Sequence, residues 1–409
     1  LGALNGLHLS VDAIRDVHGI EIDLAEIPQE PVIYDMLTRA DTVGVFQVES
    51  RAQMATLPRM KPKTFYDLAV EVALIRPGPI QGHSVHPYLR RRNGEEPIRY
   101  PHPLTESILN KTLGVPIFQE QLMELARVCA GFSAGQSDRL RQAMTHKRSD
   151  EAMALLQDDV FAGMAANGID GAAAAEIWEK LQGFASFGFP ESHSVSFAYI
   201  VYMSSWLKYH WPTEFFAGLL NAQPMGFYSP NSLVQDARHH GVVTLPPDIN
   251  QSWFDCTVEP RFADEDDIAE YLGMRWRRGR GAFDDPMRTP VALRLGLRYV
   301  RNLGDAEITR IEAARMVAGP FATAEDLAQR TGLPVDALEA LAAGGALEPL
   351  GVGRREGIWA AGALAGMGPD RLPLAAGTEA PELPPMVRYD EMQADLWSTG
   401  ISVQHPVSF

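Results

Sequence analysis

The sequence has little cysteine and no surplus of positive charge. Its 409 residues contain two cysteines, Cys129 and Cys256, too few for a disulfide framework or a zinc finger, so we expect a reducing, cytoplasmic location. Acidic residues outnumber basic residues by 52 to 36, which gives a formal net charge of −16. This balance speaks against a generally basic protein that coats nucleic acid.

The sequence also lacks a membrane-spanning run and the short motifs of several enzyme classes. Its most apolar stretch, residues 195–211, is short for a span and carries Lys208 and His210. We therefore expect a buried core helix there and no membrane partner. Cys-x-x-Cys, His-Glu-x-x-His and the Gly-rich loop that ends in Lys-Ser or Lys-Thr are absent, so these chemistries have no support.

The apolar residues that are present follow the period of a helix. Leu122, Leu125 and Cys129 share one face of a helix that we predict to begin near Phe118, and residues 177–184 repeat this spacing. The length and the 46% hydrophobic content allow two to four domains. The pattern predicts a mainly α fold with minor β structure.

Other segments indicate where elements begin and end. We expect a helix from Ser149 to about Asn167, ended by Gly168, and short strands near residues 43–46 and 242–245.

Two stretches differ in composition from the rest. Residues 258–290 combine an acidic run with an arginine-rich run, which we interpret as an exposed β-like insertion rather than a nucleic-acid contact. Residues 364–386 are rich in Pro, Gly and Ala and are expected to form a linker.

The negative total conceals a basic block. Residues 51–148 contain fifteen Lys or Arg and eight Asp or Glu, a surplus of seven positive charges. The block holds most of the motifs that suggest binding chemistry.

The first motif covers residues 137–148. On a helix, Asp138, Arg141 and Thr145 share one face, and His146, Lys147 and Arg148 follow at one end. Such donors suit a triphosphate or a nucleic-acid backbone. The alternative is a solvent-exposed helix whose charged side chains pair with each other four residues apart. The spacing alone favours this alternative.

The second motif offers basic residues in two nearby segments. Arg76 precedes a proline, which biases it to an extended conformation from which it could bind phosphate or pair with a carboxylate. The consecutive Arg90, Arg91 and Arg92 could follow a phosphate backbone, or could be exposed charge only.

A Phe-rich and Gly-rich segment, residues 183–194, contains His193. Aromatic rings beside polar groups can stack on bases, and His193 could bind phosphate or donate a proton. The alternatives are a hydrophobic hinge in which Ser192 caps the next helix, and a structural histidine.

The fourth motif, residues 295–315, resembles a helix-hairpin-helix. The turn Asn302, Leu303 and Gly304 opens a helix whose free N–H groups can receive a DNA phosphate, and Asn302 tolerates the positive φ usual for glycine. A second unit is expected at residues 331–341. Plain helical hairpins share this pattern, and acidic neighbours weaken the electrostatic case.

Together these strings resemble the bacterial C-family DNA polymerases, the DNA polymerase III α-subunit. The matching blocks, in order, are Val45-Phe-Gln-Val-Glu-Ser-Arg51, Leu74-Ile-Arg-Pro-Gly-Pro79, Gln119-Glu-Gln121, Leu140-Arg-Gln-Ala-Met144, Phe187-Gly-Phe-Pro-Glu-Ser-His193 and Pro247-Asp-Ile-Asn250. Similarity to the damage-inducible, error-prone branch rests on Gln81-Gly-His-Ser-Val-His-Pro87, Gln223-Pro-Met-Gly-Phe-Tyr-Ser-Pro230 and Arg354-Arg-Glu-Gly-Ile-Trp-Ala360.

The resemblance implies a division of the chain. Its parts are an exit from the palm at 1–35, fingers at 36–250, the insertion at 251–290, tandem helix-hairpin-helix units at 291–350, and a linker toward an oligonucleotide-binding fold at 351–409. The three palm aspartates, which bind two Mg²⁺ for nucleotidyl transfer, are expected upstream of Leu1. We therefore expect an internal fragment that is inactive alone.

The resemblance also implies roles and partners. Arg141 matches the first arginine of a block that approaches the incoming triphosphate, Gln142 replaces the second, and Lys147, Arg148, Arg76 and His193 are further nucleotide-binding candidates. Arg90–Arg92 and residues 302–304 are the DNA-binding candidates. The expected function is error-prone synthesis from dNTPs on primer-template DNA, in translesion synthesis and repair, with a sliding clamp and accessory translesion proteins as further partners. The alternatives are a non-enzymatic DNA-binding module and the housekeeping replicative subunit.

Overall fold

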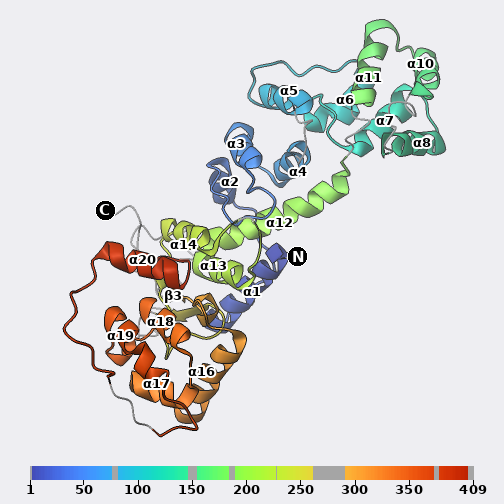
Figure 1. The fold of residues 1–409 in the computed structure, drawn as a ribbon. Coiled ribbons are helices and arrows are strands. Elements are labelled where there is room, and N and C mark those ends of the chain that lie inside the picture. The colour runs from blue at the N-terminus through green and yellow to red at the C-terminus, as the bar shows by residue number, and fades with distance from the viewer. Residues whose placement is uncertain are drawn as a thin grey trace. The chain divides into compact units, whose positions relative to one another are not determined.

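The computed structural model describes residues 2–75, 82–145, 154–183, 189–226, 228–260, 291–372 and 377–403, and these are mainly helical (Figure 1). The expected mainly α fold with minor β structure is confirmed. The chain divides into two compact units. We call residues 28–205 the central unit, and residues 1–27 with 206–409 the terminal unit. The functional boundaries implied by the resemblance are a different division and remain predictions.

The central unit is built from helices. Their bounds are α2 Pro31–Thr38, α3 Arg51–Met60, α4 Phe65–Leu74, α5 Gly82–Arg92, α6 Pro103–Leu109, α7 Gln119–Cys129, α8 Ala134–Thr145, α10 Gln157–Ala166, α11 Gly171–Gly183 and the part of α12 (Glu191–His210) up to Ser205; a 3₁₀ turn, η1, covers Asn110–Thr112. Ser50 and Gln53 cap the start of α3 reciprocally, and Thr64 and Asp67 do so for α4.

The two best-supported helix predictions in the central unit are confirmed. α7 begins directly after Phe118, and Leu122, Leu125 and Cys129 are fully buried along one side of it. α11 buries Ile177 and Leu181 in the same hydrophobic cluster. Apolar residues at helical spacing located these elements because that spacing is the face that the core covers.

Two local predictions need correction. Residues 43–46 form turns rather than a strand: Gly44 and Gln47 have φ values of 75° and 67°, and Thr42 Oγ1 donates to Val48 O at 2.8 Å. These turns bury Val45 and Val48 completely but leave Val43 partly exposed. The helix expected over 149–167 is interrupted: residues 149–153 lie outside the described ranges, Ala154 is helical, residues 155–156 form a turn, and α10 begins at Gln157. Gly168, with φ 75°, follows the end of α10 as predicted.

The terminal unit combines helices with a small sheet. Its helices are α1 Gly2–His18, the remainder of α12, α13 Pro212–Asn221, α14 Pro230–His239, α16 Asp305–Ala318, α17 Ala324–Thr331, α18 Val335–Ala343, α19 Arg354–Leu364 and α20 Arg388–Ser398, with 3₁₀ turns η3 Leu297–Tyr299 and η4 Glu348–Leu350. α1 packs along α13 (Figure 1).

The sheet has the strand order β1 (Thr244–Leu245), β3 (Val291–Arg294), β2 (Thr257–Pro260). β3 runs parallel to β1 and antiparallel to β2, with Pro260 opposite Val291. β1 confirms the strand expected near 242–245. The predicted insertion is thus bracketed by two paired strands, and its residues 261–290 lie outside the described ranges.

The predicted linker is only partly structureless. Residues 365–372 and 377–387 contain no regular helix or strand, but α19 and α20 on either side are folded. Arg354 of α19 donates to Asp395 of α20 at 2.6 Å, so both helices belong to the packed terminal unit.

The apolar helix α12 is a core helix, as expected. Val201, Trp206 and Leu207 are buried together with the polar Ser204 and Lys208. Across the described ranges, no helix is both long enough and apolar enough to span a lipid bilayer.

Candidate nucleic-acid interface

The first candidate residues lie on the outer face of α8. The helix buries Leu140 and Ala143, which turns Asp138, Arg141 and Gln142 toward solvent. Arg141 Nε and Gln142 Nε2 both donate to the Asp138 carboxylate at 2.8 Å. These bonds, from Arg141 above all, lower the pKa of Asp138. The predicted shared face of Asp138 and Arg141 is therefore confirmed, and Arg141 is oriented by a carboxylate one turn away.

Three other nucleotide-binding candidates lie outside the described residues. They are Lys147 and Arg148 of this motif and Arg76 of the proline-flanked segment, and their nucleotide contacts remain predictions.

His193 lies in the first turn of α12, in the central unit. Its ring packs between Phe189 and Phe197, with centroids 5.3 and 4.3 Å away, yet the residue is exposed. The helix begins at Glu191, so Ser192 lies inside it and does not cap it. The alternative in which Ser192 is the cap is wrong because the helix begins one residue earlier.

Glu191 fixes this end of α12. Its carboxylate accepts from Tyr66 Oη and from Lys111 Nζ, each at 2.7 Å, and its backbone N–H donates to Glu120 at 2.9 Å. Burial, and then the bond to Glu191, raises the pKa of Tyr66 well above its usual range. The network positions the turn that carries His193, and sequence reasoning did not single out Glu191 for this role.

Arg92, at the end of α5, is held inside the central unit. Its guanidinium donates to Asp67 at 2.6 Å, to Lys61 O at 3.0 Å and to Met60 O. Burial alone would raise the pKa of Asp67, but the bonds from Arg92 and from two backbone N–H groups lower it. Arg92 is thus a structural tie between α5 and the chain around α3 and α4.

Its two neighbours differ from it. Arg91 Nη1 donates to Leu113 O at 2.8 Å, and the Arg91 side chain is only 10% exposed. Arg90 pairs with Glu96 at 2.9 Å and is 48% exposed. The alternative of exposed charge is therefore wrong for Arg91 and Arg92. DNA contact by Arg90 to Arg92 remains a prediction, and the exposed side chain of Arg90 suits it best.

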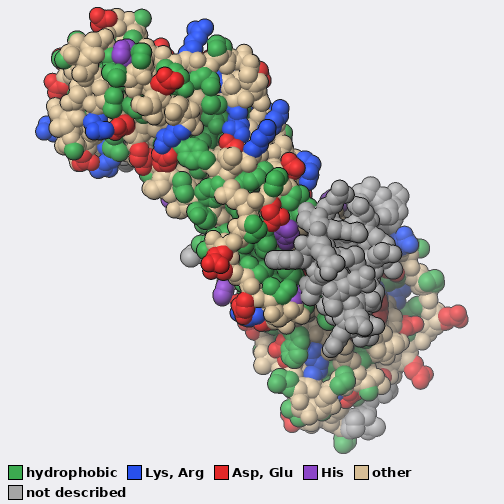
Figure 2. All heavy atoms as spheres, turned by 180° about the vertical axis from the view of Figure 1, so that it is seen from behind, with side chains coloured by type: hydrophobic (Ala, Val, Ile, Leu, Met, Phe, Trp, Pro, Cys, Tyr) green, Lys and Arg blue, Asp and Glu red, His purple; other side chains and the backbone are tan. Residues whose placement is uncertain are grey.

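The surface of the central unit carries mixed charge. On the face seen in Figure 2, basic and acidic side chains are interspersed over this unit instead of forming one continuous basic patch. The surplus of positive charge in residues 51–148 is accordingly spread among ion pairs such as Arg90–Glu96 and Lys111–Glu191.

The first predicted hairpin turn is present in the terminal unit. Asn302 adopts φ 61°, as expected for the position usually held by glycine, Leu303 is buried, and Gly304 precedes α16. The Gly304 N–H donates to Glu307 Oε2 at 3.2 Å. One N–H that could receive a phosphate is thus already paired with a carboxylate.

The second predicted hairpin is also present. α17 ends at Thr331 and is followed by Gly332, whose φ is 57°; Leu333 is buried, and Pro334 precedes α18.

Sequence reasoning missed a third turn of the same kind. Gly351, with φ 76°, Val352 and Gly353 lead into α19, and the Gly353 N–H donates to Glu356 at 2.9 Å. The Gly-hydrophobic-Gly pattern was the signal that could have found it.

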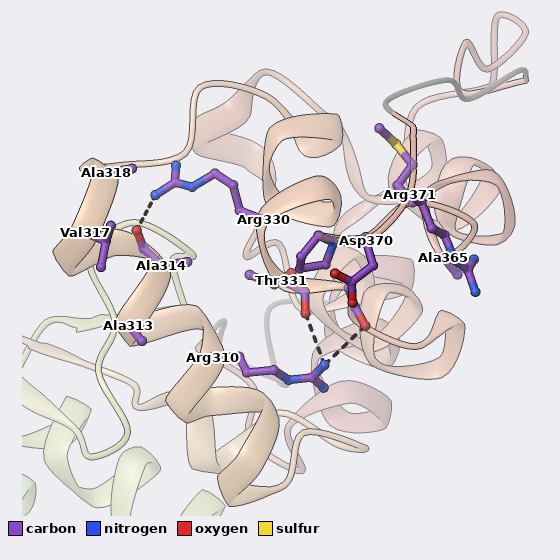
Figure 3. Close-up of a pocket in the computed structure, with 14 residues that line it drawn as sticks. Arg310, Ala313, Ala314, Val317, Ala318, Arg330, Thr331, Ala365, Asp370 and Arg371 are labelled. Atoms are coloured by element: carbon purple, nitrogen blue, oxygen red, sulfur yellow. Dashed lines mark hydrogen bonds between the residues drawn. The ribbon is translucent and has the colours of Figure 1, made fainter.

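A cavity of about 720 Å³ lies beside the second hairpin. Figure 3 shows Arg310 of α16 directed at the end of α17 and Arg330 directed at α16. Arg310 donates to Thr331 O at 3.1 Å, Arg330 to Gly319 O at 2.7 Å, and Arg371 to Gly366 O at 2.7 Å. These arginines bind backbone carbonyl groups and hold α16, α17 and the following segment together, so the cavity is not by itself a phosphate site.

Comparison with known proteins agrees with this architecture. A family model described as the bacterial DNA polymerase III alpha subunit finger domain matches residues 3–168, and one described as a helix-hairpin-helix motif matches residues 241–357. Error-prone DNA polymerases of Mycolicibacterium paratuberculosis, Mycobacterium tuberculosis H37Rv and Corynebacterium jeikeium are each 50% identical to the chain over its whole length. The chain spans about a third of those relatives, 35% of each. The chain therefore carries the finger domain of the bacterial DNA polymerase III alpha subunit, followed by a helix-hairpin-helix region, and it is similar along its whole length to error-prone DNA polymerases.

Proposed function

We propose that the chain supplies the fingers and the helix-hairpin-helix region of an error-prone, template-directed DNA polymerase. The observation that carries this proposal is the likeness, at 50% identity from end to end, to relatives named error-prone DNA polymerase. Such an enzyme transfers a nucleotide from a dNTP to a primer 3′ end. Because the chain spans 35% of those relatives, the activity belongs to the full-length protein.

Arg141 is the residue proposed to bind the triphosphate. A guanidinium donates to two phosphate oxygens at once, and the bond from Arg141 Nε to Asp138 at 2.8 Å limits the orientations of the side chain before a nucleotide arrives. Gln142, fixed by the same carboxylate, offers a hydrogen bond but no charge. His193, stacked between two phenylalanines at the start of α12, is the second proposed contact.

Mg²⁺ is the expected cofactor of the full-length enzyme. Arg141, Gln142 and His193 do not fit Mg²⁺, which prefers carboxylate and water oxygens, and Asp138 already accepts from both of its neighbours. These residues are therefore not proposed as metal ligands, and that role is proposed for the palm carboxylates that the family resemblance implies.

Primer-template DNA is the proposed macromolecular partner. The turns 302–304 and 332–334 each lead into a helix whose first N–H groups can receive a phosphate. A sliding clamp, accessory translesion proteins and a cytoplasmic location are proposed on the family resemblance.

Two other functions are weaker. A non-enzymatic DNA-binding module would not need the finger domain that matches residues 3–168. A housekeeping replicative subunit is disfavoured because the similar relatives are named error-prone.

The test is Arg141→Ala in the full-length protein. We expect the KM for dNTP to rise about 10- to 100-fold, since a charge-assisted contact to phosphate is lost. The matched control is Arg127→Ala, because Arg127 on α7 pairs with Glu124 three residues earlier and is 59% exposed. Steady-state primer extension measures both.

Arg141→Lys tests the geometry of the contact, because it keeps the charge and loses the fork of donors. An unchanged dNTP dependence together with weaker DNA binding would favour the non-enzymatic module instead.

A further inference from the structure

Helix α20 presents an aromatic stripe on its outward face. Tyr389, Gln393 and Trp397 recur every four residues, and Tyr389 and Trp397 are 51% and 43% exposed. Gln393 Nε2 donates to Tyr389 Oη at 2.7 Å. At 1.5 Å per residue, the two rings are about 12 Å apart along the helix axis.

The opposite face of α20 is anchored. Met392, Asp395 and Ser398 are buried, and Arg354 of α19 donates to Asp395 at 2.6 Å. The aromatic stripe is therefore carried on a fixed helix, which lowers the entropy cost of a ligand that stacks on it.

One end of the stripe joins the first hairpin turn. The Arg301 N–H donates to Ser398 O at 2.6 Å, and the Arg301 guanidinium lies 5.3 Å from the centre of the Trp397 ring. Arg301 and Asn302 are both exposed. A cation, an aromatic ring and the backbone of a turn in the helix-hairpin-helix region thus form one continuous surface.

We propose that Tyr389, Trp397 and Arg301 form a binding track for single-stranded DNA next to the hairpin at 302–304. Unstacked bases lie on the aromatic faces, and Arg301 contacts a base or a phosphate. The site rests on the proposed function, in which the helix-hairpin-helix region holds primer-template DNA, and it assigns the unpaired template strand a place beside the duplex.

The charges around the stripe favour nucleic acid over a protein partner. Asp390 pairs with Arg355 at 3.2 Å and Asp395 pairs with Arg354, so both carboxylates are neutralised by α19. Arg301 is then the charged group in contact with the Trp397 ring. Duplex DNA keeps its bases stacked inside the helix, so the aromatic rings select a single strand.

The test uses the full-length protein and two fluorescent probes, a blunt duplex and the same duplex with a 5′ template overhang. Trp397→Ala should weaken binding of the overhang probe about 5- to 100-fold, as measured by fluorescence anisotropy at fixed salt. The affinity of the same variant for the blunt duplex should stay within twofold of the affinity of the unaltered protein. Trp397→Phe should retain most of the affinity, and Tyr389→Ala should repeat the effect from the other end of the track.

Trp359→Ala is the matched control, because Trp359 lies on α19, is 57% exposed and is not in the stripe. Equal loss on both probes would indicate a structural role for Trp397, and no loss with either Trp397→Ala or Tyr389→Ala would overturn the track. Loss of a protein complex with unchanged DNA affinity would assign the stripe to a protein partner. The anisotropy assay measures binding of the overhang without any synthesis, so it tests the track alone. Primer extension by the unaltered protein tests the proposed polymerase function separately.

Discussion

At the scale of single residues, the arginines at the end of α5 differ although they are consecutive. Arg92 binds Asp67 and two backbone carbonyl groups, whereas Arg90 makes a surface pair with Glu96. The same side chain therefore has a structural role at one position and is available to a polyanion at the other.

This contrast predicts two separable phenotypes. Arg90→Ala should weaken DNA binding evenly across sequences and reduce the slope of log affinity against log salt by about one. Arg92→Ala should instead lower the free energy of unfolding by about 1.5–3 kcal/mol, because charged hydrogen bonds are lost. Salt titrations of binding and urea unfolding measure the two effects; an Arg90 variant with an unchanged salt slope would contradict the assignment.

Glu71 is a second residue whose surroundings decide its behaviour. It is fully buried in α4, and within the part of the chain that the structure describes neither carboxylate oxygen has a hydrogen-bond partner. Burial raises the pKa of Glu71 to about 8, against a small opposing effect of Arg92. Below that pH the folded protein retains a proton that the unfolded chain loses from about pH 4.5 upward.

The free energy of unfolding should therefore fall as the pH rises from about 4.5 to about 8. The expected slope is about 1.4 kcal/mol per pH unit for this one group. Glu71→Gln should remove this contribution and stabilise the protein at pH 8. Glu106→Gln, at an exposed position of α6, is the control. Urea unfolding measures the free energy of unfolding of both variants across the pH range. The same pH dependence in Glu71→Gln and Glu106→Gln would contradict a buried neutral carboxyl group at Glu71.

At the scale of elements, two glycines set the closeness of α1 and α13. A Cβ at Gly218 would lie 2.3 Å from Ser10 Oγ and 2.5 Å from Gly6 O, and one at Gly6 would lie 3.0 Å from Leu219. The close approach also brings His18 of α1 to 2.6 Å from Glu214 of α13, with both side chains buried.

Gly218→Ala should force α1 away from α13 and lower the free energy of unfolding by about 1–3 kcal/mol. Gly362→Ala in α19 is the matched control, since nothing lies within 4 Å of its Cβ, and it should stabilise the terminal unit by about 0.5–1 kcal/mol. Thermal unfolding measures the stability of both variants. Equal effects of Gly218→Ala and Gly362→Ala would mean that α1 and α13 can move apart without loss of stability.

The elements also show what sequence could predict. α7, α11 and the turn at Asn302 were predictable because apolar spacing and a residue tolerant of positive φ act locally. Arg91 and Arg92 were not, because their carbonyl partners lie 22 and 32 residues away in the sequence. The carboxylate that pairs with the Gly304 N–H is near in sequence, but only the folded turn shows that it occupies the donor.

At the scale of the whole molecule, the division of labour with the rest of the polymerase gives a further prediction. Purified residues 1–409 should not extend a primer with Mg²⁺ and dNTPs, because the proposed metal carboxylates belong to another part of the enzyme. Circular dichroism would first verify that the protein is helical, as α1 to α20 require. Primer extension by this chain would show that the catalytic carboxylates lie within it.

The pairing of β2 with β3 also bears on how the protein can change. Pro260 and Val291 are partners across the sheet, so the thirty intervening residues leave and return at one point of the terminal unit. The entropy cost of closing such a connection grows slowly, by about 0.6 kcal/mol for each doubling of length. This end of the β2–β3 pair is thus a place where evolution can lengthen the chain, and where an engineer can graft a reporter domain, with little effect on the hairpins that follow.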